Sequence, residues 1–427
     1  MVGKPLSLPK AMIQKNLLLC SLFLSWPLLG QPKEIEKTSS WPQWRGPDRN
    51  GIISKDSAWP SKIDKETLTE KWRVSLGKGY SGPVVSQDLV FTTESVDEYE
   101  LTYAYNRKDG KLVWQTQWEG KMKVPFFAAK NGSWIRSTPT YDGNNLFVCG
   151  MRDVLHSLDA ETGKVHWKVD FTERYKTPLP AFGTVCSPLV DGDNLYVQAG
   201  AGFVKLDKKS GDSIWHSLKD KGGMFGSAFS SPVIKEICGN RQVVVQTRTN
   251  LTGVNPKSGE EMWSKPIKAF RGMNILTPTI TDNTIFTSSY GGKSLLFKLT
   301  KNGKKQQLKQ SWENRQEGYM SGPIILDGYC YIHLRKQRIT CLDMSNGETK
   351  WISNESFGKY MSMISNGNEI LALDEDGTLY LIDPNPEKFV IKESRKISES
   401  PTWAHLAIAD NQIFVRELEA LVCYSWD

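Results

Sequence analysis

Side chains suited to ligand binding recur at one kind of position, next to short lead segments of small residues and proline. The lead segments read Ser81-Gly82-Pro83, Ser137-Thr138-Pro139, Ser187-Pro188, Ser231-Pro232, Thr277-Pro278 and Ser321-Gly322-Pro323, with weaker versions around Ser362-Met363 and from Trp403 to His405. The residues that precede or join them are Tyr80, Trp134, Arg136, Phe229, Arg271, Asn274, Tyr319, Tyr360, Trp403 and His405. Aromatic rings interleaved with guanidinium groups favour an anionic or aromatic ligand, or a loop of a partner protein. The alternative is that the same rings only fill and cap an interior space.

Other motifs that carry chemistry are weak in this sequence. The five histidines are too scattered to predict a metal site: His156, His166, His216, His333 and His405. Asp374-Glu375-Asp376-Gly377 resembles part of a calcium loop, but the rest of a twelve-residue loop is missing, so we interpret it as a hairpin turn. Gly200-Ala201-Gly202 has no helix after it and is interpreted as a turn, and the chain contains no Gly-x-Ser-x-Gly motif.

The cysteine content allows a disulfide to form. The chain has seven, at positions 20, 149, 186, 238, 330, 341 and 423. Disulfides form in exported proteins, so the chain's destination bears on this point. Cys330 and Cys341 fall on neighbouring strands of one predicted hairpin, and we predict them as the best candidate pair.

A repeated pattern predicts the secondary-structure elements that position these side chains. It consists of Asp or Asn, three residues, Gly, three residues and Trp. It occurs five times, as Asn106-Gly110-Trp114, Asp159-Gly163-Trp167, Asp207-Gly211-Trp215, Asn255-Gly259-Trp263 and Asp343-Gly347-Trp351. The Asp or Asn side chain starts a turn, the glycine supplies a positive φ, and the following strand delivers a Trp ring. Burying one such ring is worth roughly 4–6 kcal/mol before ordering costs, and an isolated hairpin has nothing to bury it against. The pattern therefore predicts near-identical sheets, each packing its Trp on the next.

The spacing of the lead segments predicts the fold class. Their period of about 45 residues fits a four-stranded propeller blade, and residues 68–427 divide into eight such segments. The turn near Gly303 is one residue short and lacks its Trp, for which Trp312 is a substitute. The last segment has only three strands, and residues 72–76 form an unattached fourth. We therefore predict an all-β, eight-bladed β-propeller of antiparallel blades, closed by its N-terminal strand.

The N-terminal residues predict export. Residues 1–30 resemble a signal peptide, with Lys10 and Lys15 before an apolar run and Gly30 at its end. The run is too short to span a bilayer and is interrupted by Pro27, while Cys20 lacks the surroundings of a lipidation site. We therefore expect no transmembrane span and a location in the periplasm or cell envelope.

Residues 31–67 are predicted to form a polar linker followed by a docked strap. Trp41-Pro42-Gln43-Trp44-Arg45-Gly46-Pro47 and the residues to Gly51 are too rich in Pro and Gly for regular structure, but their Trp residues predict docking. The net charge is +7, and its basic residues are spread along the chain. This distribution excludes a nucleic-acid-binding stripe. We expect a monomer.

These repeats and lead segments resemble those of pyrroloquinoline-quinone (PQQ)-type eight-bladed β-propellers, over residues 68–427. The resemblance is specific in five blades and weaker in three. That family includes quinoprotein alcohol dehydrogenases and non-catalytic propellers such as the outer-membrane assembly factor BamB. The strap is similar to the start of PQQ-like propeller proteins of planctomycetes and related bacteria.

The resemblance implies the fold more firmly than the chemistry. The quinoprotein dehydrogenases carry a disulfide between adjacent cysteines beside the quinone, and this chain has no Cys-Cys pair. No carboxylate and amide set can be matched to their calcium ligands. We therefore expect an exported, non-catalytic propeller without a cofactor that binds a protein or another envelope component. The alternatives are an oxidoreductase using PQQ with calcium, or other small-molecule chemistry, at the channel mouth, and a glycan-binding protein with an aromatic rim.

Overall fold

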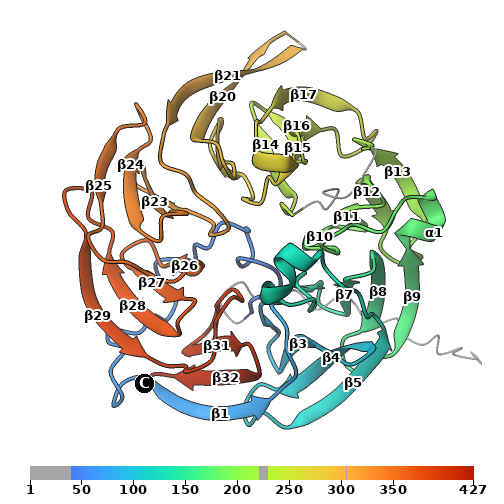
Figure 1. The fold of residues 1–427 in the computed structure, drawn as a ribbon, viewed down its shortest axis with the longest axis vertical. Helices are drawn as coiled ribbons and strands as arrows, with labels where there is room; N and C mark the ends of the chain where they lie inside the picture. Colours follow the sequence, from blue (N-terminus) through green and yellow to red (C-terminus); the bar gives the residue numbers. More distant parts are fainter. Residues whose placement is uncertain (1–39, 221–228, 304) are drawn as a thin grey trace, which may run out of the picture. The chain divides into compact units, whose positions relative to one another are not determined.

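The computed structural model describes residues 40–220, 229–303 and 305–427, and these residues form a β-propeller. Eight four-stranded antiparallel sheets follow one another around a ring, as Figure 1 shows. The predicted fold class is therefore confirmed. Besides strands, the described residues contain the short helix α1 (Phe171–Tyr175) and the 3-10 helices η1 (Phe126–Asn131) and η2 (Phe270–Gly272). Among these residues we find no helix with the length and apolar character that a bilayer crossing needs.

Each blade runs from an innermost to an outermost strand in chain order. Blades 1 to 4 are β2 (Val84–Val85), β3 (Leu89–Val96), β4 (Tyr99–Asn106), β5 (Leu112–Glu119); β6 (Thr140–Tyr141), β7 (Asn145–Gly150), β8 (Val154–Asp159), β9 (Val165–Asp170); β10 (Leu189–Asp191), β11 (Asn194–Ala199), β12 (Gly202–Asp207), β13 (Ser213–Ser217); and β14 (Val233–Ile237), β15 (Asn240–Gln246), β16 (Asn250–Val254), β17 (Glu261–Pro266). Blades 5 to 7 are β18 (Thr279–Thr281), β19 (Thr284–Ser288), β20 (Ser294–Asn302), β21 (Lys305–Asn314); β22 (Ile324–Leu326), β23 (Tyr329–His333), β24 (Ile339–Asp343), β25 (Thr349–Ile352); and β26 (Met361–Ser365), β27 (Ile370–Asp374), β28 (Thr378–Asp383), β29 (Val390–Lys396). Blade 8 is β30 (Ala407–Ala409), β31 (Gln412–Glu417), β32 (Ala420–Ser425) and, outermost, β1 (Thr69–Ser75).

The Ser/Thr-Pro lead segments join neighbouring blades around the channel. In blades 1 to 4, the N–H of the residue before the proline donates to the Ser or Thr hydroxyl of the next blade's lead segment, at 2.9–3.0 Å. The bonds form a chain in which each acceptor residue donates the next bond. Gly82 donates to Thr138, Thr138 to Ser187, Ser187 to Ser231, and Ser231 to Thr277. A proline just before the strand has no N–H to satisfy, whereas the hydroxyl of a preceding Ser or Thr serves as a buried acceptor. The Ser/Thr-Pro sequence is therefore what links one blade to the next here.

The repeated Trp residues pack on the glycine turn of the following blade. Asp159 illustrates the turn: its carboxylate accepts the N–H groups of Glu161 and Thr162 at 3.1 and 2.8 Å, and Gly163 has φ +72°. A Cβ on Gly163 would lie 2.5 Å from the ring of Trp114. The same close approach joins Trp167 to Gly211, Trp215 to Gly259, Trp312 to Gly347 and Trp72 to Gly110. Glycine is thus required twice at these turns, for its φ and for the ring above it.

The five predicted rings include two exceptions to this packing, Trp351, which meets a turn without glycine in blade 7, and Trp263. The indole N–H of Trp263 donates to Gln242 of its own blade at 2.5 Å instead of reaching the next blade's turn. The shortened turn at Gly303 explains this, because no atom lies within 4 Å of the place where its Cβ would be. Trp351 reaches blade 7 through its N–H, which donates to the carbonyl of Asn385 at 2.9 Å. Trp312 takes the role of the missing repeat Trp, as the sequence suggested.

The ring closes between the two ends of the propeller. β1 pairs antiparallel with β32, and Trp72 lies opposite Cys423 in the register. The Trp72 indole N–H donates to the carbonyl of Arg107 in blade 1 at 2.9 Å. The closing strand therefore contributes the same Trp contact that the other blades make with their own fourth strands.

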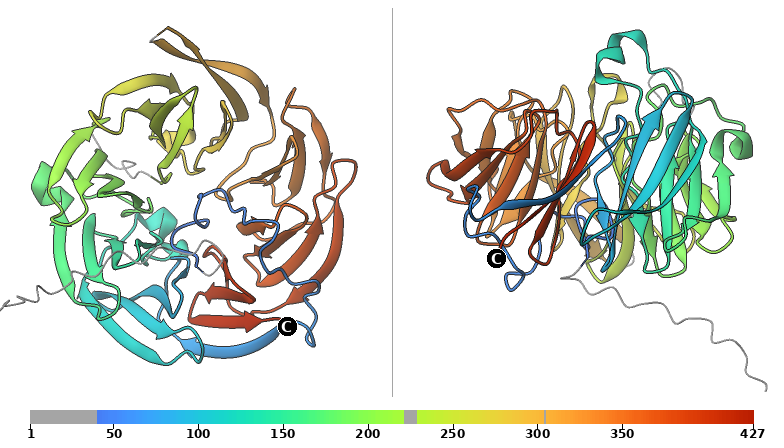
Figure 2. Two further views of the ribbon diagram at one scale, coloured as in Figure 1. Left: turned by 180° about the vertical axis from the view of Figure 1, so that it is seen from behind. Right: turned by 90° about the horizontal axis from the view of Figure 1, so that it is seen from below.

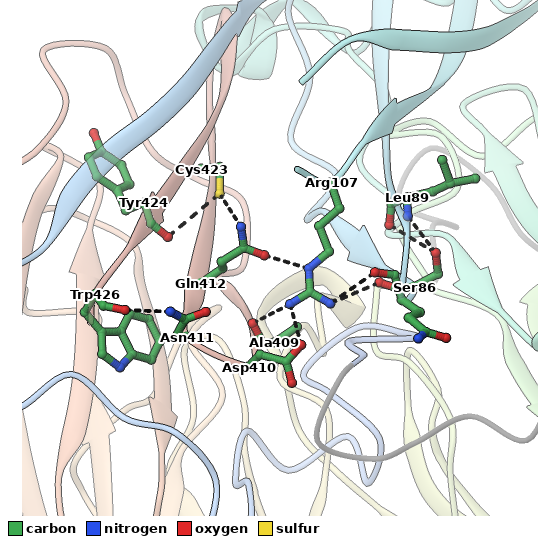
Figure 3. A network of polar contacts seen from close by, with 11 residues as sticks. Ser86, Leu89, Arg107, Ala409, Asp410, Asn411, Gln412, Cys423, Tyr424 and Trp426 are labelled. Carbon is green, nitrogen blue, oxygen red and sulfur yellow. Dashed lines mark hydrogen bonds and ion pairs between the residues drawn. The ribbon is translucent and has the colours of Figure 1, made fainter. Parts of the chain in front are cut away.

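Arg107 adds a polar latch to this closing seam, drawn in Figure 3. The residue is buried, and its guanidinium group donates to Gln412 at 2.7 Å, to the Ala409 carbonyl at 2.8 Å and to Asp410 at 2.9 Å. It also reaches the carbonyls of Ser86 and Gln87 at 3.4 Å. One side chain of blade 1 thus ties together the inner hairpin turns of blades 8 and 1.

We expect Arg107→Met to lower the free energy of unfolding by about 2–3 kcal/mol, because it leaves several buried acceptors without a donor. Urea denaturation followed by tryptophan fluorescence measures the change. The matched control is Lys108→Met, an exposed neighbour in the same turn, which should change stability by less than about 0.5 kcal/mol. Equal effects of the two substitutions would show that the latch carries no stability.

The predicted disulfide is wrong. All six described cysteines are free thiols, and Cys330 and Cys341 are both buried. Cys330 lies opposite Leu342, and Cys341 lies opposite Tyr331. Because side chains alternate between the two faces of a sheet, this offset of one residue places the two thiols on opposite faces of blade 6.

Candidate functional site

The strap, residues 41–51, crosses the centre of the ring, where Figure 1 and the rear view of Figure 2 show it in dark blue. Its backbone bonds to the innermost strands of three blades. Trp41 exchanges two hydrogen bonds with Val85, and the Pro42 carbonyl accepts the N–H of Tyr141. At its other end, the Gly51 carbonyl accepts the N–H of Ser365 at 2.8 Å. These partners lie where the innermost strands end, so the strap occupies the end of the channel opposite the lead segments.

Two arginines of the strap extend into the channel. Arg49 donates to the carbonyls of Ser187, Pro188 and Pro232, and Arg45 donates to that of Pro323. Both residues have positive φ, 58° at Arg45 and 56° at Arg49. Such values are uncommon outside glycine and persist only where the surroundings enforce them. The strap therefore holds both guanidinium groups against the lead segments.

Both strap arginines are buried without a carboxylate partner among the described residues. Arg45 is 1% exposed and Arg49 is 3% exposed, and neither forms an ion pair in the part of the chain that the structure describes. Burial lowers the pKa of each to about 10. At neutral pH both groups therefore keep their charge in the middle of the propeller.

A pocket of about 140 Å³ lies at the channel mouth. Six of the ten predicted site residues line it: Tyr80, Arg136, Phe229, Tyr360, Trp403 and His405. Trp44 of the strap joins them. The remaining lining comes chiefly from lead-segment residues such as Thr138, Ser187, Ser231 and Thr277. The structure thus brings together side chains from all eight blade junctions and from the strap.

Aromatic contacts fix the walls of this pocket. Tyr80 and Trp403 stack at 5.1 Å with 25° between their planes, and the Arg136 guanidinium lies 5.8 Å from the centre of the Tyr80 ring. The cluster continues from Trp403 to Tyr360 at 6.4 Å, and it ends where Trp44 and His405 meet edge to face at 5.1 Å. His405 also contacts Tyr360 at 5.8 Å. Rings held by one another in this way form a rigid, mostly apolar wall beside a cation.

The other four predicted site residues lie outside the pocket lining. Trp134 contacts Tyr80 edge to face at 5.3 Å. Tyr319 packs against Tyr290 at 5.0 Å, and Arg271 lies over the Phe270 ring at 5.0 Å. Asn274 is buried and donates to the carbonyls of Thr247 and Arg248 at 3.1 and 3.0 Å. Asn274 thus ties the β17–β18 loop to the β15–β16 turn, whereas the ring of Trp134 flanks the pocket beside Tyr80.

Burial and nearby charge set the protonation of the lining groups. Burial, together with the charge of Arg45, lowers the pKa of His405 to about 3, so this imidazole is neutral. Burial raises the pKa of Tyr80 to about 12 and lowers that of Arg136. At neutral pH, Arg136 is therefore the charged group in the wall, and Arg45 and Arg49 are charged beneath it.

The sequence reasoning missed the contribution of the strap to this site. Trp44, Arg45 and Arg49 form or underlie the floor of the pocket, but the sequence predicted only that the strap docks. The available signal was two arginines set among Trp, Pro and Gly residues in a segment predicted to be docked. An arginine in such a segment must either face solvent or insert into the body.

A calcium-bound quinone does not fit this lining. Ca²⁺ takes six to eight oxygen ligands, usually including carboxylates. The residues that line the pocket include no Asp or Glu, and Arg136 adds a positive charge. The described residues also contain no cluster of three or more His, Cys, Asp or Glu side chains able to hold a metal ion. We therefore derive no reaction from PQQ or calcium.

Comparison with known proteins places the fold in a family. A sequence model of the family described as "Outer membrane protein assembly factor BamB" matches residues 60–132 and 100–353, more than half of the chain. The chain belongs to this family. BamB of Yersinia pestis is 22% identical over 355 residues, which cover 79% of this chain and 84% of that protein.

Solved structures agree with the BamB family in fold. BamB from Moraxella catarrhalis superposes with a TM-score of 0.62 at 15% identity, covering 84% of this chain and 98% of the other. Quinohemoprotein alcohol dehydrogenase from Comamonas testosteroni also gives 0.62, at 11% identity, covering 91% and 81%. At such identities these likenesses concern the fold alone. The resemblance to PQQ-type propellers of the BamB kind is thus confirmed.

Proposed function

We propose that this protein is a non-catalytic scaffold of the cell envelope that binds another protein during outer-membrane protein assembly. The proposal is supported chiefly by membership of the BamB family over more than half of the chain. The lining of the channel mouth also supports it, because aromatic walls beside a cation suit protein recognition better than a metal-dependent reaction. We propose the channel mouth and its rim as the binding surface.

The rim of the mouth carries exposed apolar side chains. They lie in loops that join the outermost strand of one blade to the innermost strand of the next, and all these loops meet at the mouth end. Phe126 is 90% exposed and Phe127 46% exposed in the β5–β6 loop, and Phe270 is 50% exposed in the β17–β18 loop. Leu179 of the β9–β10 loop is 41% exposed. Aromatic residues presented in this way are typical anchors of protein interfaces.

The β5–β6 loop is held in place from below. Met122, Val124 and Ala128 pack with Met151 of the β7–β8 turn and Phe182 of the β9–β10 loop. The side view of Figure 2 shows η1, the coil of this loop, standing out from the ring. The buried base fixes the loop: the half-exposed ring of Phe127 contacts Phe182 of the base at 6.1 Å, and Phe126 is almost fully exposed. A rigid loop loses little conformational entropy when a partner covers it.

We expect the double substitution Phe126→Ser and Phe127→Ser to reduce recovery of the partner at least tenfold in affinity purification from cell envelopes. The reason is the loss of both exposed rings from the proposed interface, each worth more than about 1 kcal/mol if it is an anchor. Quantitative mass spectrometry of cross-linked envelope fractions measures recovery of outer-membrane proteins and assembly factors.

The matched control is the double substitution Leu112→Ser and Val113→Ser. These residues are 52% and 48% exposed and lie at the start of β5, at the opposite end of the propeller. Recovery should stay at the wild-type level in this control. If the control lost the partner and the rim variant kept it, the channel mouth would not be the binding surface.

A further inference from the structure

The channel-mouth pocket concentrates positive charge that no described carboxylate balances. Arg136 lines its wall, and Arg45 and Arg49 are buried among the residues that form its floor. Arg45 lies 5.6 Å from the ring of Trp44 and its charge acts on Tyr360 and His405, three residues that line the pocket. Arg49 donates to the carbonyl of Ser187, a residue that also lines the pocket. One guanidinium group thus lines the cavity, and two more are buried next to residues of its lining.

Two N–H groups of Arg45 have no hydrogen-bond acceptor. Its Nη2 donates to the carbonyls of Asn50 and Pro323, but Nε and Nη1 are buried and have no partner. Nε of Arg136 is also buried without a partner. A buried guanidinium group with free N–H groups is costly unless an acceptor, preferably an anion, completes its bonds. The strap nevertheless holds Arg45 here with a positive φ.

The aromatic residues that line the pocket favour a ligand with a flat apolar group. One continuous wall of rings runs from Tyr80 through Trp403, Tyr360 and His405 to Trp44. His405 is neutral and adds no charge of its own. Phe229 also lines the cavity. A hydrated inorganic ion gains nothing from such rings, whereas a flat apolar group stacks on them.

We propose that this pocket binds a carboxylate attached to an aromatic group, with the carboxylate facing Arg136 above the buried charges of Arg45 and Arg49 and the ring against the aromatic wall. Arginine is suited to this role because its planar fork matches the two oxygens of a carboxylate. Two sources supply this chemistry: a free aromatic acid, or an aromatic residue at the carboxyl end of a protein segment. Only the second source rests on the proposed scaffold function.

Titration of the purified protein with 3-phenylpropanoate tests the proposal, followed by calorimetry and by tryptophan fluorescence. We expect saturable binding, with 3-phenylpropanamide at least tenfold weaker and inorganic phosphate weaker still. Equal affinity for the acid and the amide, tighter binding of phosphate, or no binding of the acid would overturn the proposal. This comparison uses the wild-type protein and does not depend on the folding of a variant.

The variant Arg136→Gln should bind 3-phenylpropanoate at least tenfold more weakly while its thermal unfolding stays close to that of the wild type. The matched control is Arg271→Gln, which removes a cation from the same face but outside the pocket. Its affinity should be unchanged. If Arg136→Gln bound as tightly as the wild type, the carboxylate would not face this guanidinium group, and the proposal would fail.

The peptide Gly-Gly-Tyr, compared with its C-terminal amide, distinguishes the two sources. Tighter binding of the peptide acid than of 3-phenylpropanoate supports a protein segment, and the reverse supports a free aromatic acid. Failure of the proposed function has a separate signature, because recovery of an envelope partner is measured without any of these ligands. Loss of acid binding with partner recovery intact would refute the pocket proposal alone.

Discussion

Trp72→Ala is expected to lower the free energy of unfolding by about 3–5 kcal/mol, the usual cost of truncating a buried Trp to Ala. Trp72 is 8% exposed, packs on the turn at Gly110 and donates its indole N–H to Arg107. It also lies in β1, the strand that completes blade 8. The substitution therefore weakens the contact between the closing strand and blade 1, where the two ends of the propeller meet. Urea denaturation, with circular dichroism as the probe, measures the loss.

Trp72→Phe separates the contribution of ring burial from that of the indole hydrogen bond. Phe keeps most of the ring burial but cannot donate to the Arg107 carbonyl, so we expect a smaller loss of about 1–3 kcal/mol. If Trp72→Ala unfolded at the wild-type urea concentration, β1 would not be needed to close the ring.

Gly163→Ala is expected to destabilise the protein by about 2–4 kcal/mol. A side chain at its φ of +72° costs about 1 kcal/mol by itself. Its Cβ would also lie 2.5 Å from the Trp114 ring, so the ring or the turn must move, and overpacking of this kind costs about 1–3 kcal/mol more. The measurement is the urea midpoint followed by circular dichroism.

Gly239→Ala is the matched control for the strain alone. Gly239 has a similar φ of +68°, but no atom lies within 4 Å of the position of its added Cβ. We expect this substitution to cost about 1 kcal/mol. Equal losses at the two positions would mean that the contact between Trp and glycine adds nothing to the cohesion of the blades.

Local patterns sufficed to predict the ring. The Asp-x3-Gly-x3-Trp spacing encodes a turn and its packing partner within one short segment, so neither depends on distant residues. Trp312 could be identified because the rest of its repeat survives. Trp263 shows the limit: its own repeat is intact, but its contact depends on the turn at Gly303, in the next blade. The repeat of one blade does not predict whether the turn of the next blade is intact.

The candidate site could be predicted only in part, for a related reason. Tyr80, Trp403 and the other lead-segment residues share a position in the repeat, so the fold brings them to one end of the channel. The strap lies outside the repeats, and no periodicity indicates where Arg45 and Arg49 insert. The disulfide prediction failed because it used strand adjacency without register, and a shift of one residue separates Cys330 from Cys341. Long-range placement and register are what the sequence left undetermined.

Site-specific photo-cross-linking in living cells tests the central claim most directly, because it reports which face of the propeller meets a partner. A photoreactive phenylalanine analogue replaces Phe126 at the channel mouth in one strain and Leu112 at the opposite end in another. The account predicts a cross-link to an outer-membrane protein or assembly factor from position 126 and none from position 112. A cross-link from position 112 alone would contradict the assignment of the channel mouth as the binding surface.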